Sequence, residues 1–166
     1  MKKRMFMLFP IFILLSVSAR AQDGFPKAEV FGGHSALSSD SGRGRVESFG
    51  FQASVAGNFH KNVGIVGDFG GQYRNSAHIY EYLLGPRFSV RRSKGTAFVH
   101  ALFGGVTAGG GNGSDSAFAM GFGGGIDVNV NNHAAVRGIQ FDWTPIHGAG
   151  AWDMKSIRLG LGIVIK

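Results

Sequence analysis

The sequence lacks cysteine, carries little charge and has one long hydrophobic run. The absence of cysteine excludes disulfides, thiolate zinc sites and thiol catalysis. Charged residues make up 16% of the chain, against roughly 25% in soluble domains. Its 28 glycines argue against long helices, because glycine inside a helix costs about 1 kcal/mol relative to alanine. A chain of 166 residues, 44% of them hydrophobic, suggests one domain with a large apolar surface.

The long hydrophobic run lies at the N-terminus. Three basic residues at positions 2–4 precede the apolar stretch 5–17, and residues 18–21 supply the small side chains of an A-x-A cleavage site. We therefore predict a signal peptide over residues 1–21, cleaved after Ala21, and a single β-barrel domain over residues 22–166. The alternative is a membrane anchor, but the run is shorter than the roughly 20 residues that a spanning helix needs.

Removal of this leader changes the charge of the chain. Four of the 17 basic residues lie within it, which leaves 13 basic and 10 acidic residues. The sequence pI of about 10.2 is therefore partly a property of the leader. A nucleic-acid partner loses its main support, and we expect none.

Apolar and small or polar side chains alternate with period two through most of the remaining chain, which indicates β-strands. Eight strands of about ten residues are predicted, at 27–37, 49–59, 63–74, 80–90, 96–108, 118–128, 134–143 and 157–165. The inward face of the fifth is unclear because both of its faces are apolar. A membrane-spanning strand needs about 9–11 residues.

The predicted connections differ on the two sides of the sheet. Those after odd strands are 38–48, 75–77, 109–116 and 144–154, of which three are long and polar or glycine-rich; those after even strands are 60–62, 91–95 and 129–133. Long loops on one side and short turns on the other are typical of outer-membrane barrels. We therefore predict an all-β fold: an eight-stranded antiparallel up-and-down transmembrane barrel.

The two strand faces also favour this fold over a soluble lipocalin-like barrel, although periodicity alone does not separate the two. One face carries large Phe, Leu and Ile side chains that suit lipid tails. The other is mostly Gly, Ala and Ser, which fit the narrow interior of eight strands. Closure would remove every strand edge, as hydrocarbon demands.

A set of polar residues falls on the predicted inward face, and aromatic residues fall near strand ends. The predicted lumen network consists of Gln52, Asp68, Arg74, Glu81, Arg87, Asp127, Gln140, Asp142 and Arg158. The predicted lipid-facing aromatic girdle consists of Phe49, Phe59, Tyr73, Tyr80, Phe88, Phe118 and Trp143. Because unpaired buried charges are costly, we expect the lumen charges to pair and block the lumen; the alternatives are a gated ion path or a catalytic carboxylate. Arg137 shares parity with Ile139 and is expected near a rim, with its side chain reaching toward water.

The six histidines show no metal-ligand spacing, and no metal or cofactor is expected. A barrel esterase would need a rim histidine with a serine; His100 or His147 are the candidates, without a local signature. The G-G-x-G-x-D match at 110–115 is a single copy of a calcium repeat that works only when stacked, so a flexible outer loop is favoured. Arg43 and Arg45 are candidates for contact with lipopolysaccharide, and solvated loop charge is the alternative.

Three segments carry a resemblance to a known family. They are 121–127 (GFGGGID), 135–143 (AVRGIQFDW) and 157–164 (IRLGLGIV). The chain resembles the small OmpA-like outer-membrane β-barrels of Gram-negative bacteria, over about residues 26–166. The resemblance implies a cell outer-membrane location, porin-family-like architecture, and roles in envelope integrity or surface interaction.

The resemblance also implies partners: outer-membrane lipids, lipopolysaccharide and, during biogenesis, the barrel-assembly machinery. One departure concerns the last partner. The family's last strand usually ends in Phe or Trp, whereas this sequence ends Val164-Ile165-Lys166. Either the machinery tolerates this ending or a terminal aromatic residue is missing from the end of the sequence.

The sequence thus predicts a non-enzymatic outer-membrane barrel that serves as a scaffold, with no cofactor. The alternatives are a narrow porin-like channel, a lipid A-modifying barrel enzyme and a soluble ligand-binding barrel.

Overall fold

The computed structural model describes residues 24–40, 44–74, 77–110, 113–148 and 151–166. The predicted signal peptide, including Ala21, and Arg43 lie outside these residues.

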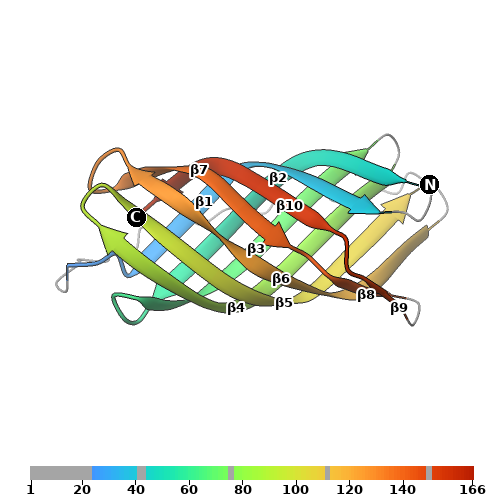
Figure 1. Ribbon diagram of the computed structural model, residues 1–166, viewed down its shortest axis with the longest axis horizontal. Coiled ribbons are helices and arrows are strands. Elements are labelled where there is room, and N and C mark those ends of the chain that lie inside the picture. Colours follow the sequence, from blue (N-terminus) through green and yellow to red (C-terminus); the bar gives the residue numbers. More distant parts are fainter. Residues whose placement is uncertain (1–23, 41–43, 75–76, 111–112, 149–150) are drawn as a thin grey trace, which may run out of the picture.

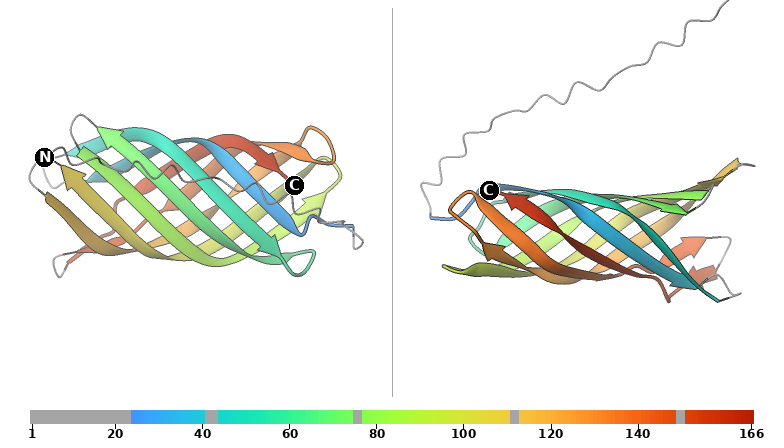
Figure 2. Two further views of the ribbon diagram at one scale, coloured as in Figure 1. Left: turned by 180° about the vertical axis from the view of Figure 1, so that it is seen from behind. Right: turned by 90° about the horizontal axis from the view of Figure 1, so that it is seen from above.

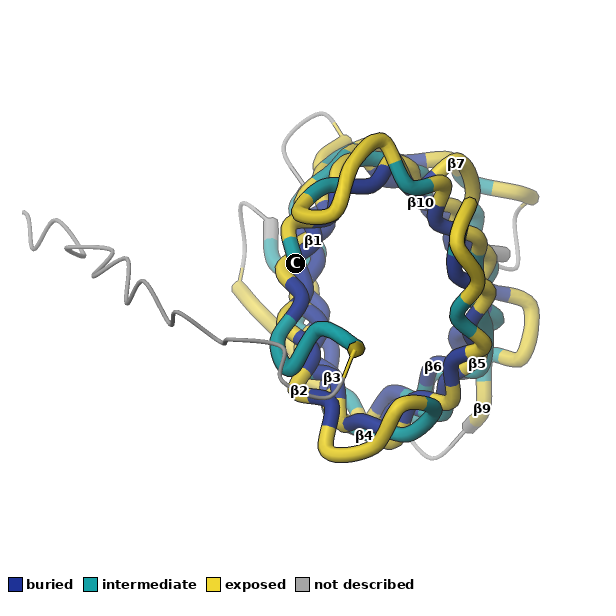
Figure 3. Tube along the Cα trace, turned by 90° about the vertical axis from the view of Figure 1, so that its left-hand side faces the viewer, coloured by how far each residue is buried: buried dark blue, intermediate teal, exposed yellow. Residues whose placement is uncertain are grey.

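Eight long strands form a closed antiparallel barrel (Figure 1). They are β1 (Ala28–Asp40), β2 (Arg45–Asn58), β3 (Val63–Arg74), β4 (Ala77–Arg92), β5 (Gly95–Gly110), β6 (Gly113–Asn129), β7 (Ala134–Trp143) and β10 (Ile157–Ile165). Each strand pairs with its neighbour in the chain, and β1 pairs with β10 from Val30↔Ile165 to Ser38↔Ile157. The strands run obliquely to the barrel axis (Figure 2), and seen from one end they form a complete ring (Figure 3). The predicted fold class is confirmed.

The two ends of the barrel differ. The turns β2–β3, β4–β5 and β6–β7 lie at one end together with the last residue, Lys166; we call this the short-turn end (left in Figure 1). The connections after β1, β3, β5 and β7 lie at the other, which we call the long-loop end. Two short strands there, β8 (Ile146–Gly148) and β9 (Ala151–Asp153), form a hairpin beside the outer part of β6.

The strands at the long-loop end are longer than the sequence predicts. The predicted loops 38–48 and 109–116 lie largely in strands, with pairs such as Ser38↔Glu47 and Thr107↔Ser116. These polar residues also pair through side chains: Arg45 Nε donates to Ser38 Oγ at 2.8 Å. Period-two alternation of large side chains marks only the apolar part of a strand, whereas the backbone ladder continues beyond it because hydrogen bonding does not need an apolar face.

The segment 144–154 was also predicted as an irregular loop, and it contains β8 and β9. Phe118 pairs with His147, and His147 stacks on Trp152 with ring centroids 4.8 Å apart. Strands of three residues are too short for a period-two signal, so the sequence pattern did not reveal them.

Glycines allow close strand contact at the β1–β10 seam. A Cβ on Gly33 would overlap the backbone carbonyl of Leu161, and one on Gly162 would overlap that of Gly32. Glycine at these positions therefore permits the register that joins the first strand to the last.

Burial alternates along each strand as a barrel with an apolar outer surface requires. On β2, Val55 is 58% exposed whereas Ala56 is 2% exposed; on β10, Leu161 is 57% exposed and Arg158 is 0% exposed. Most of the large Phe, Leu, Ile and Val side chains thus lie on the outside, together with a few polar side chains such as His34, which faces outward between Phe51 and Leu161. The tube in Figure 3 carries this alternation around the whole ring.

Part of the lumen is apolar. Buried Val66, Leu83, Leu102 and Val106 pack together with Ala56 and Ala119. Phe31, Ala135 and Val164 form a second, smaller apolar cluster. Most of the other buried side chains are polar and form the candidate site.

Candidate functional site: the polar lumen

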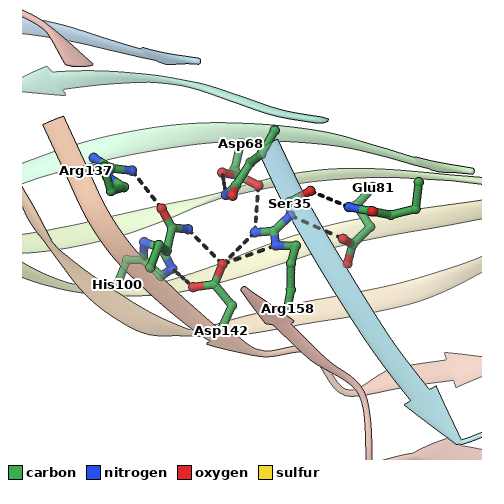
Figure 4. A network of polar contacts seen from close by, with 10 residues as sticks. Ser35, Asp68, Glu81, His100, Arg137, Asp142 and Arg158 are labelled. Atoms are coloured by element: carbon green, nitrogen blue, oxygen red, sulfur yellow. Dashed lines mark hydrogen bonds and ion pairs between the residues drawn. The ribbon is translucent and has the colours of Figure 1, made fainter. Parts of the chain in front are cut away.

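Arg158 on β10 is the centre of a buried ion-pair cluster. Its Nη2 lies 2.8 Å from Asp68 Oδ1 on β3 and 2.8 Å from Asp142 Oδ2 on β7. Its Nη1 lies 3.2 Å from Glu81 Oε2 on β4. Figure 4 shows the guanidinium between the three carboxylates. Since β3 and β4 are not neighbours of β10, these contacts cross the lumen.

Amide and imidazole groups complete this central cluster. Gln52 Nε2 donates to Asp68 Oδ2 at 2.6 Å, and Gln140 Nε2 donates to Asp142 Oδ2 at 2.7 Å. His100 Nε2 lies 2.7 Å from Asp142 Oδ1. Asp142 thus has polar partners on both carboxylate oxygens, which fixes its position although it is fully buried.

A second cluster lies nearer the short-turn end. Arg137 forms a bidentate ion pair with Asp127, with Nε 2.7 Å from Oδ1 and Nη2 3.1 Å from Oδ2. Arg87 lies 2.8 Å from Glu29 and 3.6 Å from Asp127. Arg91 contacts the other oxygen of Glu29 at 3.1 Å. Arg137 Nη1 also donates to Gln140 Oε1 at 2.7 Å, so the two clusters are joined.

Two buried aromatic rings support the arginines of the second cluster. The Arg137 guanidinium lies 4.2 Å from the ring centroid of Phe31 and 4.3 Å from that of Phe98, and Arg87 lies 4.2 Å from Phe98. Planar guanidinium groups stack on aromatic faces while their edges donate to carboxylates. This combination lets the charged groups pack densely.

The clusters differ in charge balance. The central cluster sets one arginine against Asp68, Glu81 and Asp142, whereas the second sets three arginines against Glu29 and Asp127. Chemically, both arrangements fill space and tie together strands that are not neighbours. Removing one partner would leave a buried charge uncompensated.

The structure brings together eight of the nine residues predicted for the lumen network. Gln52, Asp68, Glu81, Arg87, Asp127, Gln140, Asp142 and Arg158 are all buried and in contact with other members. Arg74 is exposed instead. The alternation on β3 stops at Gln72, two residues before the strand ends, so strand parity does not carry Arg74 into the lumen.

Arg137 was predicted near a rim, and this prediction is wrong. Arg137 is 3% exposed and part of the second cluster. A β-bulge on β7 explains the error: Gly160 pairs with Gln140 and Gly162 with Arg137, so β7 has one extra residue. Gly138 and Ile139 both face outward there, and the parity changes between Ile139 and Arg137.

Several lumen residues were not singled out from the sequence. They are Glu29, Ser35, Gln72 and Arg91, and His100 was considered only as an esterase candidate and not for the lumen; among them Gln72 donates to Ser35 Oγ at 2.5 Å. Glu29 and Ser35 lie on β1, where the alternation is weak, and His100 lies on β5, where both faces are apolar. The alternation of Glu29 with outward Val30 is the signal that would have placed it.

The predicted girdle residues are outward-facing and lie at two levels. Phe49, Tyr73 and Phe118 are 66%, 48% and 45% exposed toward the long-loop end, and Phe59 and Phe88 are 65% and 50% exposed toward the short-turn end. Tyr80 and Trp143 are half-buried at the long-loop end. Their neighbours partly cover them: Tyr80 Oη lies 3.2 Å from Tyr73 Oη, and Trp143 lies beside the Phe122 ring.

Neither candidate esterase histidine has the surroundings that an esterase site needs. His100 contacts Asp142 in the lumen and His147 stacks on Trp152; within the described residues neither makes a hydrogen bond with a serine. No group of three metal-ligating His, Asp or Glu side chains is found in the described part of the chain. Among the same residues, no helix is long and apolar enough to cross a membrane.

The glycine-rich segment 110–115 lies partly outside the described residues, and its described part belongs to β5 and β6.

Known proteins resemble this chain in structure. No family model and no curated protein matches its sequence. Neisserial surface protein A (NspA) superposes with a TM-score of 0.72 at 13% identity, over 85% of this chain and 97% of that one. The barrel therefore has the fold of small outer-membrane proteins.

Two further neighbours have the same fold. The N-terminal β-barrel domain of Pseudomonas aeruginosa OprF matches with a TM-score of 0.58 at 12% identity, over 84% of this chain and 96% of that one. Ail, the attachment invasion locus protein of Yersinia pestis, matches with a TM-score of 0.55 at 16% identity, over 83% of this chain and 96% of that one. The predicted resemblance to OmpA-like barrels is confirmed at the level of the fold.

Proposed function

We propose that this protein is an outer-membrane β-barrel that works as a lipid-embedded scaffold, with a side-chain-filled lumen and no catalytic role. The apolar outer surface requires a lipid environment, because contiguous exposed apolar surface of this extent is unfavourable in water. The fold shared with NspA, OprF and Ail supports placement in the outer membrane.

The observation that carries the scaffold role is the Arg158 cluster. Its ion pairs to Asp68 and Glu81 connect β10 with β3 and β4 across the lumen, and its ion pair to Asp142 joins it to the neighbouring strand β7. A charged network of this kind is stable only when its members are paired, and pairing holds the side chains in the ion path. The function is then performed at the ends of the barrel, where the strands extend beyond the aromatic girdle.

Three measurements on the refolded full chain test this proposal. The folded barrel should run faster on a gel unheated than after boiling, and should resist carbonate extraction from vesicles. In a planar bilayer it should give a flat current trace. Regular conductance steps would instead support the narrow-channel function, and release by carbonate would support a soluble barrel.

The surface partner at the long-loop end stays a prediction. Among the described residues, that end carries three basic and three acidic exposed or half-exposed side chains: Arg45, Arg74 and Lys155 against Glu47, Asp115 and Asp153. Contact of Arg45 with lipopolysaccharide is tested by comparing binding of lipopolysaccharide micelles to the wild type and to Arg45→Gln.

A further inference from the structure

The net charge of the barrel is concentrated at its short-turn end. Six basic residues lie there: Lys27, Lys61, Arg91, Arg92, Lys94 and Lys166; we call this set the cationic rim. The acidic residues of the described strand ends near this level are Glu29 and Asp127, and both are buried and paired, with Arg87 and Arg91 for Glu29 and with Arg87 and Arg137 for Asp127. The described residues of the long-loop end, by contrast, include three basic residues, Arg45, Arg74 and Lys155, and four acidic ones, Asp40, Glu47, Asp115 and Asp153.

The cationic rim is built on turns that are bonded to one another. Asn62 accepts from Ser89 N at 2.7 Å through its backbone oxygen and donates to Ser89 O at 2.7 Å through its side chain, which ties the β2–β3 turn to β4. Arg91 Nη1 donates to the carbonyl of Lys61 across the same boundary. The cations of these two turns are therefore held side by side.

Asparagine side chains extend this linkage around the end of the barrel. Asn129 Nδ2 donates to Ser93 O at 3.1 Å, and its backbone N donates to Lys94 O at 3.0 Å. Lys166 Nζ donates to Asn129 Oδ1 at 2.5 Å. Asn58 Nδ2 donates to Pro26 O at 2.9 Å, next to Lys27. The rim is thus a rigid array, which reduces the entropic cost of binding a multivalent anion.

Half-burial among these neighbours lowers the pKa of the Lys166 ammonium, although Glu29 opposes the shift. The side chains of Lys61, Arg92 and Lys94 are exposed and make no hydrogen bond or ion pair with the described part of the chain. Like charges gathered in this way repel one another, so a bound anion would relieve the repulsion.

The position of these cations identifies the kind of anion. Lys61 follows Phe59 by two residues, and Arg92 follows Val90 by two; Phe59 and Val90 are 65% and 41% exposed on the apolar outer surface. Lys94 precedes Gly95, which pairs with outward-facing Val128. Cations immediately beyond a lipid-facing apolar band lie at the depth of lipid headgroups.

We propose that the cationic rim binds anionic phospholipid headgroups of the leaflet at the short-turn end. This inference rests on the proposed function, because it requires a barrel that spans a membrane. Lys61, Arg92 and Lys94 would contact the headgroup phosphates directly. Arg91 and Lys166, already bonded within the rim, would position the turns that carry them.

The test compares two triple variants of equal charge change. The rim variant is Lys61→Gln/Arg92→Gln/Lys94→Gln, and the control at the long-loop end is Arg45→Gln/Arg74→Gln/Lys155→Gln. Each protein is refolded into phosphatidylcholine vesicles, and competition with spin-labelled phosphatidylglycerol and spin-labelled phosphatidylcholine gives a relative association constant. Since basic side chains near the membrane surface favour anionic lipids, the wild-type preference for phosphatidylglycerol should fall by at least about fivefold in the rim variant. It should change little in the control and weaken with added salt.

The proposal is overturned if the wild type shows no preference for phosphatidylglycerol, or if both triple variants lose that preference equally. It is also overturned if peptidoglycan sacculi pull down the wild type but not the rim variant while neither protein prefers an anionic lipid. Heat-modifiable mobility and carbonate resistance are measured on the same samples. A protein that fails them overturns the proposed function, whereas one that passes them without a lipid preference overturns only the inference.

Discussion

The outer and inner faces of the same strands obey different rules. On the outer face of β10, Leu159, Leu161 and Ile163 are about half exposed and face no particular partner. On the inner face of the same strand, Arg158 has three carboxylate partners at 2.8–3.2 Å. The outer face therefore needs only apolar side chains, whereas the inner face needs particular residues in a particular geometry. Substitutions on the outer face should matter only when they introduce charge, and those on the inner face whenever they remove a partner.

The largest effect is expected from Arg158→Met. It leaves Asp68, Glu81 and Asp142 without their shared cation, and breaking a buried pair in this way costs about 3–5 kcal/mol. The free energy of unfolding in vesicles, followed by tryptophan fluorescence against urea, measures the loss. Arg74→Met, at an exposed arginine, is the control and should change stability by less than about 0.5 kcal/mol. Equal effects of both variants would show that the Arg158 cluster does not stabilise the barrel.

Leu161→Arg places a charge on the outer face near the middle of β10. An arginine at the centre of the lipid-facing band costs about 2–4 kcal/mol, and the cost falls toward the interfaces. Met154→Arg, at an exposed position beyond the strands, should cost less than about 1 kcal/mol. The same urea titration in vesicles compares them. A Leu161→Arg protein as stable as the wild type would contradict the assignment of this face to lipid.

His100→Phe removes one hydrogen bond of the lumen network and is expected to have a smaller effect. It removes the partner 2.7 Å from Asp142 Oδ1, and a buried acceptor left unsatisfied costs about 1–3 kcal/mol. The exposed His133→Phe in the β6–β7 turn is the matched control, with an expected change within about 0.5 kcal/mol. If the two substitutions destabilise the barrel equally, the hydrogen bond to Asp142 contributes nothing.

The smallest effect is expected from Tyr73→Phe. It removes a hydroxyl that lies 3.2 Å from Tyr80 Oη, yet keeps the ring in the girdle. Because Tyr73 is 48% exposed, the expected change is below about 0.5 kcal/mol. Tyr73→Ala, which removes the ring itself, should cost more. The order of these two variants in the urea titration distinguishes a ring contribution from a hydroxyl contribution.

The fold could be predicted from the sequence because the outer face requires only that its residues be apolar. Alternation such as Phe49, Phe51, Val55 appears directly in the order of residues, and lipid contact requires nothing more specific. The sequence located the central cluster for a related reason, since Asp68, Glu81 and Arg158 are charged residues inside regular strands. Parity alone was enough to direct them inward.

The errors occur where neighbouring strands decide the geometry. The bulge at Gly138–Ile139 is a mismatch between β7 and both its neighbours, so the inward position of Arg137 depends on strands distant in sequence. Glu29 pairs with Arg87 from β4, across the lumen from its own strand. The polar extensions of β1, β2, β5 and β6 form through backbone pairing, which has no side-chain period to recognise.

The absence of cysteine allows the central claim to be tested with single nitroxide labels. Val55→Cys, Leu84→Cys and Leu161→Cys place labels on the outer face, where the native side chains are 58%, 60% and 57% exposed. In refolded, vesicle-embedded protein, these labels should collide often with dissolved oxygen and rarely with a water-soluble nickel chelate. Labels at all three positions that are instead readily accessible to the nickel chelate would contradict the assignment of this face to lipid.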